Sequence, residues 1–189
     1  ARLGDQALET LPHDVQRPSY DRADCAVGIV HIGVGHFHRA HQALIIDRLL
    51  TQGRATDWAI CGVALLPTDE GLARSLQQQS GLYTLVEKSS TGEWDFRVVG
   101  SITEILFGPD DPDAVLDRMS DPATKIVSLT ITEGGYFLDS DDNFDPTHPM
   151  IVADAQEPDA PETVFGMILR GLRARRDAGL APFTVMCCD

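Results

Sequence analysis

The sequence predicts an α/β fold with a doubly wound, mostly parallel sheet, and three observations support this. Continuous apolar runs, which suit parallel strands covered on both faces, occur at residues 28–32 and 58–66, and another buried strand is predicted at residues 125–132. Segments with the apolar spacing of helices separate these runs. The first run ends in two closely spaced glycines, Gly33 and Gly35, and leads into a helix-forming segment.

The bulk properties fit one ordinary domain. A length of 189 residues and an apolar share of 43% allow a substantial core. The formal net charge of −14 argues against nucleic acid and anionic membranes as partners. No apolar run approaches the ~20 residues that span a bilayer, and the N-terminal segment lacks a signal-peptide pattern.

The four cysteines predict a reducing compartment. Cys25, Cys61, Cys187 and Cys188 show no Cys-x-x-Cys spacing. Cys61 and Cys188 lie in strand-like runs, where a cysteine is usually a small buried apolar residue. We expect reduced thiols and a cytoplasmic protein.

The first half of the chain begins with an N-terminal arm, residues 1–26. Two prolines, scattered charges and no sustained period mark it as a segment that packs over the domain. The apolar pattern then predicts a buried strand at Gly28–Ile32 and a helix at Arg39–Leu50. A second buried strand follows at residues 58–66, and a helix at Asp69–Gln79.

The middle of the chain predicts an inserted β-hairpin. Residues 83–86 and 96–99 have strand composition and flank the turn residues Ser89–Gly92. A short helix is predicted at Pro112–Met119, with Asp111 as its cap.

The last third returns to alternating strands and helices. The pattern predicts a strand at Lys125–Thr132 and a loop at Asp139–Pro149. A helix opened by Thr163 or Pro161 follows and closes near Gly179, and the last strand is Pro182–Cys188. Ligands of such sheets bind beyond the carboxyl ends of the strands. We therefore expect four strand ends to converge on one crevice: Gly33–His38, Pro67–Asp69, Glu133–Gly135 and Asp189.

The double glycine after the first strand predicts a dinucleotide-binding turn. A strand that passes through two glycines into a helix brings backbone N–H groups against a pyrophosphate. The candidate cofactor-binding residues here are Ile32, Gly33, Val34, Gly35, His36, Phe37, His38 and Arg39. His38 replaces the usual third glycine, which implies a wider approach or a different helix angle. A plain strand-to-helix turn is the alternative.

Two acids are further candidates. Asp69 follows the second strand, where an acid accepts hydrogen bonds from the adenosine ribose and disfavours a 2′-phosphate, so it favours NAD over NADP. The alternative is that Asp69 only starts a helix. Glu133 ends a buried strand and either serves a proton path or the cofactor, or caps a turn.

Four histidines cluster around the glycines, but they do not predict a metal site. His31, His36, His38 and His41 have no nearby acid or cysteine at ligand spacing. Contacts to cofactor phosphates, or packing at the helix start, explain them better.

The segment Gly28–Gln42, GIVHIGVGHFHRAHQ, resembles the opening of the long-chain mannitol dehydrogenase family of polyol dehydrogenases. Five further segments are similar to that family in the same order: Ile60–Val63, Ser80–Leu85, Val127–Tyr136, Thr163–Gly166 and Phe183–Asp189.

The resemblance implies a Rossmann-like N-terminal domain, residues 27–189, incomplete at its C-terminus and followed in the family by a mainly helical domain. It implies that Gly33–Arg39 is the phosphate-binding turn, Asp69 the ribose-selecting acid and Glu133 the cofactor-side glutamate. The family uses a lysine as general base and asparagines that polarise the reacting oxygen. These are expected beyond Asp189, so no catalytic residue is assigned here.

The first hypothesis is therefore the NAD-binding part of an oxidoreductase that interconverts a sugar alcohol and a ketose, D-mannitol and D-fructose. Fructuronate reductase and arabinitol 4-dehydrogenase of the same family are the alternatives within this class. A catalytically silent dinucleotide-binding module is the alternative from another class. We expect the 189 residues alone to be inactive, and the full-length protein to be a monomer.

Overall fold

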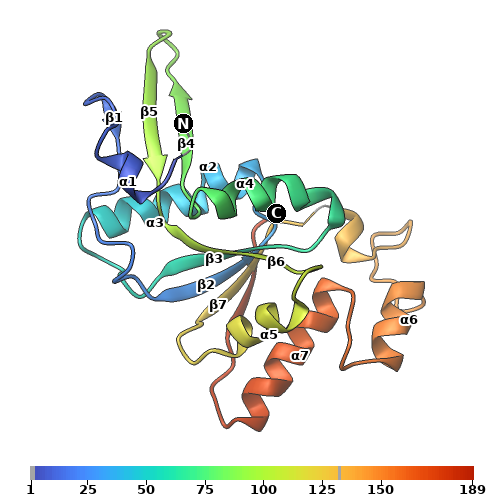
Figure 1. Ribbon diagram of the computed structural model, residues 1–189. Coiled ribbons are helices and arrows are strands. Elements are labelled where there is room, and N and C mark those ends of the chain that lie inside the picture. Colours follow the sequence, from blue (N-terminus) through green and yellow to red (C-terminus); the bar gives the residue numbers. More distant parts are fainter. Residues whose placement is uncertain (1–2, 132) are drawn as a thin grey trace.

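The computed structural model describes residues 3–131 and 133–189 (Figure 1). Its main sheet has five parallel strands in the order β6-β3-β2-β7-β8. These strands are β2 Val27–Ile32, β3 Ala59–Ala64, β6 Ile102–Phe107, β7 Ile126–Leu129 and β8 Thr184–Cys187. The chain builds the sheet outward from β2 in one direction and then returns to the other side of β2 with β7. The predicted doubly wound, mostly parallel sheet is confirmed, with its switch point between β2 and β7.

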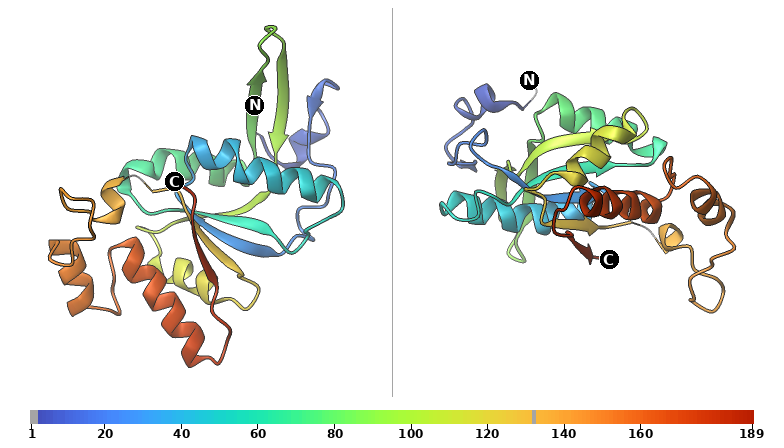
Figure 2. Two further views of the ribbon diagram at one scale, coloured as in Figure 1. Left: turned by 180° about the vertical axis from the view of Figure 1, so that it is seen from behind. Right: turned by 90° about the horizontal axis from the view of Figure 1, so that it is seen from below.

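Helices cover both faces of this sheet (Figures 1 and 2). One face carries α2 His36–Ala40, α3 Gln42–Thr51 and α4 Glu70–Gln78, and the other carries α5 Pro112–Ser120 and α7 Val164–Asp177. Neighbouring residues of one strand point to opposite faces and enter separate cores, because side chains alternate along a strand. Ile29 packs in the core beneath α3 and α4, and Val30 in the core beneath α5 and α7.

The predicted hairpin is confirmed and projects from the domain (Figure 1). It consists of β4 Tyr83–Lys88 and β5 Trp94–Val99, which pair antiparallel in register from Tyr83↔Val99 to Lys88↔Trp94. The short strand β1 Val15–Gln16 adds to β5 in parallel and makes a second, three-stranded sheet.

The N-terminal segment, which includes helix α1 Asp5–Leu8, is attached to the domain through buried polar contacts. Tyr20 donates a hydrogen bond of 2.7 Å to the carboxylate of Asp47 on α3. Asp47 is fully buried and also accepts from the backbone N–H of Gly100 at 2.9 Å. Arg22 donates to the carbonyl oxygens of Gly100 and Ile102 at 2.9 and 3.0 Å. The segment is thus bonded to the start of β6 and to α3.

The single helix predicted over Arg39–Leu50 is wrong, because two helices meet at His41. The helical path begins earlier, at His36, and His41 has φ −121° and ψ −85°. The hydroxyl of Tyr83 donates to the carbonyl oxygen of Arg39 at 2.5 Å. This carbonyl is therefore satisfied outside the helix, which allows the break.

The sequence analysis missed α1 and β1 in the N-terminal segment and two later elements, β6 and α6. Strand β6 contains Thr103 and Glu104, which interrupt its apolar pattern, and Glu104 pairs with Arg118 at 2.6 Å beside the sheet edge. Helix α6, Pro149–Gln156, buries none of its residues, and a helix without a buried face needs no apolar period in its sequence. It begins at Pro149, the last residue of the predicted loop Asp139–Pro149. Strand β7 ends at Leu129, earlier than predicted, and Thr132 lies outside the described residues.

The remaining short elements are the 3-10 turns η1 Pro67–Asp69 and η2 Glu133–Tyr136. The predicted Asp111 and Thr163 caps are both present, accepting from Ala114 N at 2.9 Å and from Gly166 N at 3.1 Å. In the described part of the chain, no helix has both the length and the apolar character needed to cross a membrane.

Candidate functional site

The candidate site lies where β2 and β7 end side by side at the switch point. Gly33 follows β2, and its N–H donates to the carbonyl oxygen of Val63 on β3 at 3.0 Å. Thr130 follows β7, its N–H donates to the carbonyl oxygen of Ile32 at 3.0 Å, and its hydroxyl donates to the carbonyl oxygen of Gly33 at 2.8 Å. The first glycine is thus fixed between two neighbouring strands.

Different physical reasons explain why glycine occupies the two positions of the turn. Gly33 has φ +100°, and a Cβ there would overlap the carbonyl oxygen of Thr130. The protein itself therefore requires a glycine at this position. Gly35 has φ −66° and ψ −174°, which any residue adopts, and an added Cβ would meet none of the described atoms within 4 Å. Open space beside Gly35 is what the approach of a ligand to the backbone requires.

Two buried imidazoles, those of His31 and His38, pack against each other next to the glycine turn. His31 on β2 and His38 on α2 stack face to face, with ring centroids 3.5 Å apart and planes 12° apart. His38 thus occupies the position of the third glycine of the common pattern, and the two rings replace a close contact between backbones.

Hydrogen-bond contacts hold the ring of His31 in place at both of its nitrogens. Its Nε2 lies 3.0 Å from the carbonyl oxygen of Gly33 and 2.9 Å from the hydroxyl of Thr130. Its Nδ1 lies 2.7 Å from the Ser128 hydroxyl, which in turn lies 3.2 Å from the side-chain oxygen of Gln42. For His38, no atom among the described residues meets hydrogen-bond geometry at either ring nitrogen, although the Gln42 side chain lies nearby.

Both imidazoles are neutral at physiological pH. Burial lowers the pKa of His31 to about 4, although the Gly33 carbonyl and the charge of Asp189 oppose this. Burial and the neighbouring His31 lower the pKa of His38 to about 2. Neither ring therefore serves as a cation for phosphates, and the pair acts as a rigid support.

The other predicted residues of the turn have separate positions. Ile32 and Val34 are buried in the cores on opposite faces of the sheet, so only their backbones reach the crevice. His36 is exposed, and the exposed Phe37 ring stacks on His41 at 4.3 Å. Arg39 donates through Nε to the carbonyl oxygens of Val34 and Gly35 at 3.1 and 3.3 Å, and so holds the turn closed.

Asp69 lies on the other side of the crevice, after β3. It ends η1 and occupies the N-cap position of α4, yet within the described chain its side chain makes no capping hydrogen bond. Capping therefore does not account for this acid. One turn later, Arg74 pairs with Glu70 at 3.3 Å and with Asp110, in the loop after β6, at 2.6 Å.

The ends of β7 and β8 come together beside the histidines. Glu133 begins η2, and its side chain lies outside the described residues. The Tyr136 hydroxyl donates to the carboxylate of Asp189 and lies 2.9 Å from the sulfur of Cys187. A mostly apolar pocket of about 260 Å³ opens here, lined by His31, Phe37, His38, His41, Gln42, Ile45, Ile46, Thr130, Met186 and Cys188. The segments after β7 and β8 thus meet through Tyr136 and Asp189, and β8 residues share the pocket with His31 and His38, whereas Asp69 follows the neighbouring strand β3.

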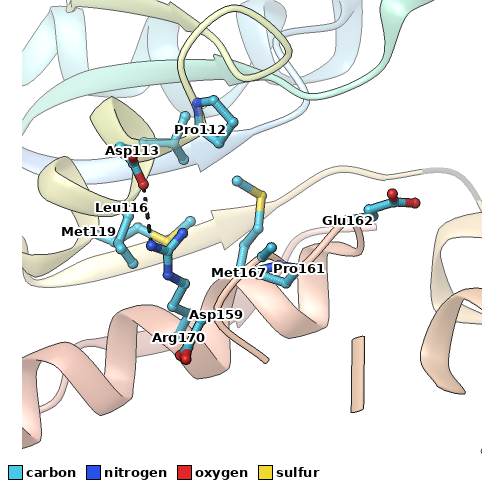
Figure 3. A pocket seen from close by; sticks show the side chains of 11 residues that line it. Pro112, Asp113, Leu116, Met119, Asp159, Pro161, Glu162, Met167 and Arg170 are labelled. Atoms are coloured by element: carbon cyan, nitrogen blue, oxygen red, sulfur yellow. Dashed lines mark hydrogen bonds and ion pairs between the residues drawn. The ribbon is translucent and has the colours of Figure 1, made fainter. Parts of the chain in front are cut away.

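A larger cavity, of about 430 Å³, lies elsewhere, between α5 and α7. Figure 3 shows the apolar side chains of Met119 and Met167 between the two helices and the ion pair of Asp113 with Arg170, whose charged atoms lie 3.2 Å apart. None of the predicted site residues that the structure describes lines this cavity. Its arginine is engaged within the protein, so the cavity gives no reason to place the site there.

Across residues 3–131 and 133–189, no three His, Cys, Asp or Glu side chains are grouped as ligands for an ion. The four cysteines are free thiols.

Sequence reasoning missed Ser128, Thr130, Gln42 and the Arg74–Asp110 pair. Ser128 and Thr130 alternate with apolar residues at the end of a buried strand. This placement of polar groups was the available signal, because buried hydroxyls need partners. Arg74 and Asp110 belong to distant segments, and their pairing has no signature in the sequence.

Comparison with known proteins gives a consistent result. A family model described as the mannitol dehydrogenase Rossmann domain matches residues 27–189. A mannitol 2-dehydrogenase of Cereibacter sphaeroides is 52% identical over 179 residues, covering 95% of this chain and 37% of the relative. A polyol:NADP oxidoreductase of Gluconobacter oxydans is 45% identical over 187 residues, covering 97% of this chain and 38% of the relative.

Two solved structures share the fold over the whole chain. The ternary complex of Pseudomonas fluorescens mannitol 2-dehydrogenase with NAD and D-mannitol has a TM-score of 0.95 at 45% identity. A substrate-free D-sorbitol dehydrogenase has a TM-score of 0.93 at 42% identity. The chain covers 39% of each of these proteins, so it spans about two fifths of their length.

Proposed function

Because the chain belongs to the mannitol dehydrogenase family, we propose that residues 27–189 are the NAD-binding part of an oxidoreductase that interconverts D-mannitol and D-fructose. Residues 1–26 form an arm attached to this domain. The similar proteins are more than twice as long as the chain, so the activity and the substrate of the whole protein are part of the proposal.

The observation that carries the proposal is Gly35. Its backbone angles need no glycine, and its missing side chain leaves open space rather than room for a protein neighbour. A pyrophosphate that approaches the backbone explains why a residue without Cβ is present. Gly33 would be a glycine in any protein with this turn, and so it carries less weight.

The remaining candidates divide between the two halves of NAD. The backbone of Ile32–Phe37 holds the pyrophosphate, supported by Arg39 and by the stacked His38. Asp69 accepts hydrogen bonds from the adenosine ribose and disfavours a 2′-phosphate, so NAD is the proposed cofactor. Glu133, at the carboxyl end of β7, serves the nicotinamide side. When bound, the cofactor supplies the hydride acceptor or donor.

The described residues contribute cofactor binding rather than the proton transfer. His31 and His38 are buried and neutral, and the hydrogen bonds of His31 are all used within the turn. Hydride transfer from an alcohol also needs a base and groups that hold the developing oxyanion. We assign these groups to the part of the relatives' length that this chain does not span.

Location and assembly complete the proposal. The four free thiols support a cytoplasmic enzyme, and the family supports a role in polyol metabolism. We propose a monomer for the full-length protein.

The test measures NAD binding and turnover with purified residues 1–189. We expect saturable NAD binding, and no sustained NADH formation when mannitol is added. Gly35→Val should weaken NAD binding by about tenfold or more, ~1.4 kcal/mol, because its side chain enters the ligand space. The melting temperature should change little, because an added Cβ at Gly35 meets open space.

Gly4→Val is the matched control, since an added Cβ at Gly4 also meets open space among the described atoms, far from the crevice. Its NAD affinity should equal that of the wild type. If a folded Gly35→Val variant binds NAD as tightly as the wild type, Gly35 belongs to a plain strand-to-helix turn with no role in cofactor binding. NADH production from mannitol by these residues would show that they contain a base.

A further inference from the structure

Arg74 lies where the segments after β3 and β6 meet. Its guanidinium lies 2.6 Å from the carboxylate of Asp110 and 3.3 Å from that of Glu70. The guanidinium carbon also lies 5.1 Å from the centre of the Phe107 ring, at the end of β6. One arginine therefore connects α4 with the loop that follows the neighbouring strand.

The ion pairs of Arg74 are weak enough to exchange. Its side chain is 39% exposed, and those of Glu70 and Asp110 are 58% and 49% exposed. Ion pairs at such exposure contribute about 0–1 kcal/mol each. A doubly charged phosphate placed nearby competes well for the guanidinium, because arginine binds phosphate through two parallel hydrogen bonds.

Arg74 is close in sequence to the proposed ribose acid. Asp69 directly precedes α4, so Asp69 and Arg74 are separated by little more than one helical turn. In dinucleotide-binding folds, an acid at the end of the second strand favours NAD, and an arginine near it accommodates the 2′-phosphate of NADP. Here both elements are present, and the arginine is already engaged by two carboxylates.

We propose that Arg74 is a latent binding group for the 2′-phosphate of NADP, and that Glu70 and Asp110 determine the choice of cofactor together with Asp69 by occupying it. The proposal rests on the function proposed above. Removal of Asp69 alone then removes a repulsion but leaves the arginine occupied. Strong NADP binding requires both the loss of Asp69 and the release of Arg74.

Other arginines of the described chain are engaged elsewhere. Arg39 is bonded to the glycine turn, and Arg48 pairs with Glu87 of the hairpin at 3.7 Å. Arg118 pairs with Glu104 and Asp121 on the opposite face of the sheet. Arg74 is thus the cation that the segment after β3 offers.

The experiment measures dissociation constants for NAD and NADP on the full-length protein, and compares variants by their NAD-to-NADP ratio. Asp69→Ala should shift this ratio toward NADP. Asp69→Ala with Asp110→Asn should shift it by about a further tenfold, as one bidentate phosphate contact contributes. Adding Arg74→Met to that double variant should abolish the further shift. Asp69→Ala with Glu70→Gln provides a second release of Arg74 if the Asp110 variant fails to fold.

The matched control is Arg176→Met, which removes another exposed, paired arginine at the end of α7. It should leave both constants unchanged. The proposal is overturned if Arg74→Met leaves the NADP affinity of the folded double variant unchanged. If the wild-type protein still binds NAD, this result leaves the proposed NAD-binding function standing. A folded wild-type protein that binds neither cofactor would overturn both the role of Arg74 and the proposed function.

Discussion

The two sides of the crevice differ in how they are built. On the β2–β7 side, His31, Ser128 and Thr130 are interlocked by hydrogen bonds of 2.7–3.0 Å around Gly33. On the β3–β6 side, Asp69 and Arg74 lie in exposed or half-buried positions, and the charges pair at the surface. Buried and satisfied groups fix the shape of a site, whereas exposed charges change at small cost to the fold. The comparison separates the part that forms the crevice from the part that selects its ligand.

The largest expected effect is a loss of stability on the buried β2–β7 side. Gly33→Ala places a Cβ against the Thr130 carbonyl at a φ of +100°, so both strain and overlap oppose folding. We expect the free energy of unfolding to fall by about 3 kcal/mol, measured by urea denaturation. Gly35→Ala, two residues later, should lose less than about 1 kcal/mol. Equal losses would show that the two glycines are equivalent.

A smaller effect concerns the pH dependence of the same side. His31 has a folded pKa of about 4 against an ordinary value of 6.5. Between these values the unfolded chain binds the proton and the folded chain does not, so stability falls as the pH falls. We expect His31 to contribute a loss of about 2 kcal/mol between pH 7 and pH 5.

His31→Asn removes this titration and should reduce the slope of unfolding free energy against pH by about half, because the lowered pKa of the buried His38 contributes the rest. His13→Gln, which changes an exposed histidine of the N-terminal segment, should leave the slope unchanged. A slope that is the same in His31→Asn and in the wild type would assign the pH dependence to other groups.

The smallest expected effect concerns cofactor preference on the β3–β6 side. Asp69→Ala alone should relax the preference for NAD over NADP by about tenfold, because a nearby negative charge no longer opposes the 2′-phosphate. The melting temperature should change little, since the Asp69 side chain makes no cap to α4 within the described residues. An unchanged ratio of the two dissociation constants would mean that Asp69 does not select the ribose.

The sequence predicts the central strands better than the edges. Strands β2 and β3 are buried on both faces, so each must be a continuous apolar run. Strand β6 lies at the edge, where Glu104 pairs with Arg118, and its pattern is interrupted. The break at His41 depends on a hydrogen bond from Tyr83, which lies far along the chain. No local pattern encodes such a contact.

The candidate site shows the same limit. The glycine turn and its altered third position are local features, and the sequence predicted both. The stacking of His31 on His38 needs two elements in place, and the bonds from His31 to Ser128 and Thr130 need β7 beside β2. Residues that act through partners from distant segments become visible only in the fold.

The buried carboxylate of Asp47 has a consequence for how the molecule unfolds. It bonds the Tyr20 hydroxyl and the Gly100 N–H, and Arg97 of the hairpin lies 3.8 Å from its second oxygen. Detachment of the N-terminal segment would therefore leave a charge in the interior without one of its partners. The segment, the base of the hairpin and α3 are thus joined through one carboxylate, although the family match begins only at residue 27. The boundary of the sequence family is not a hinge of the molecule.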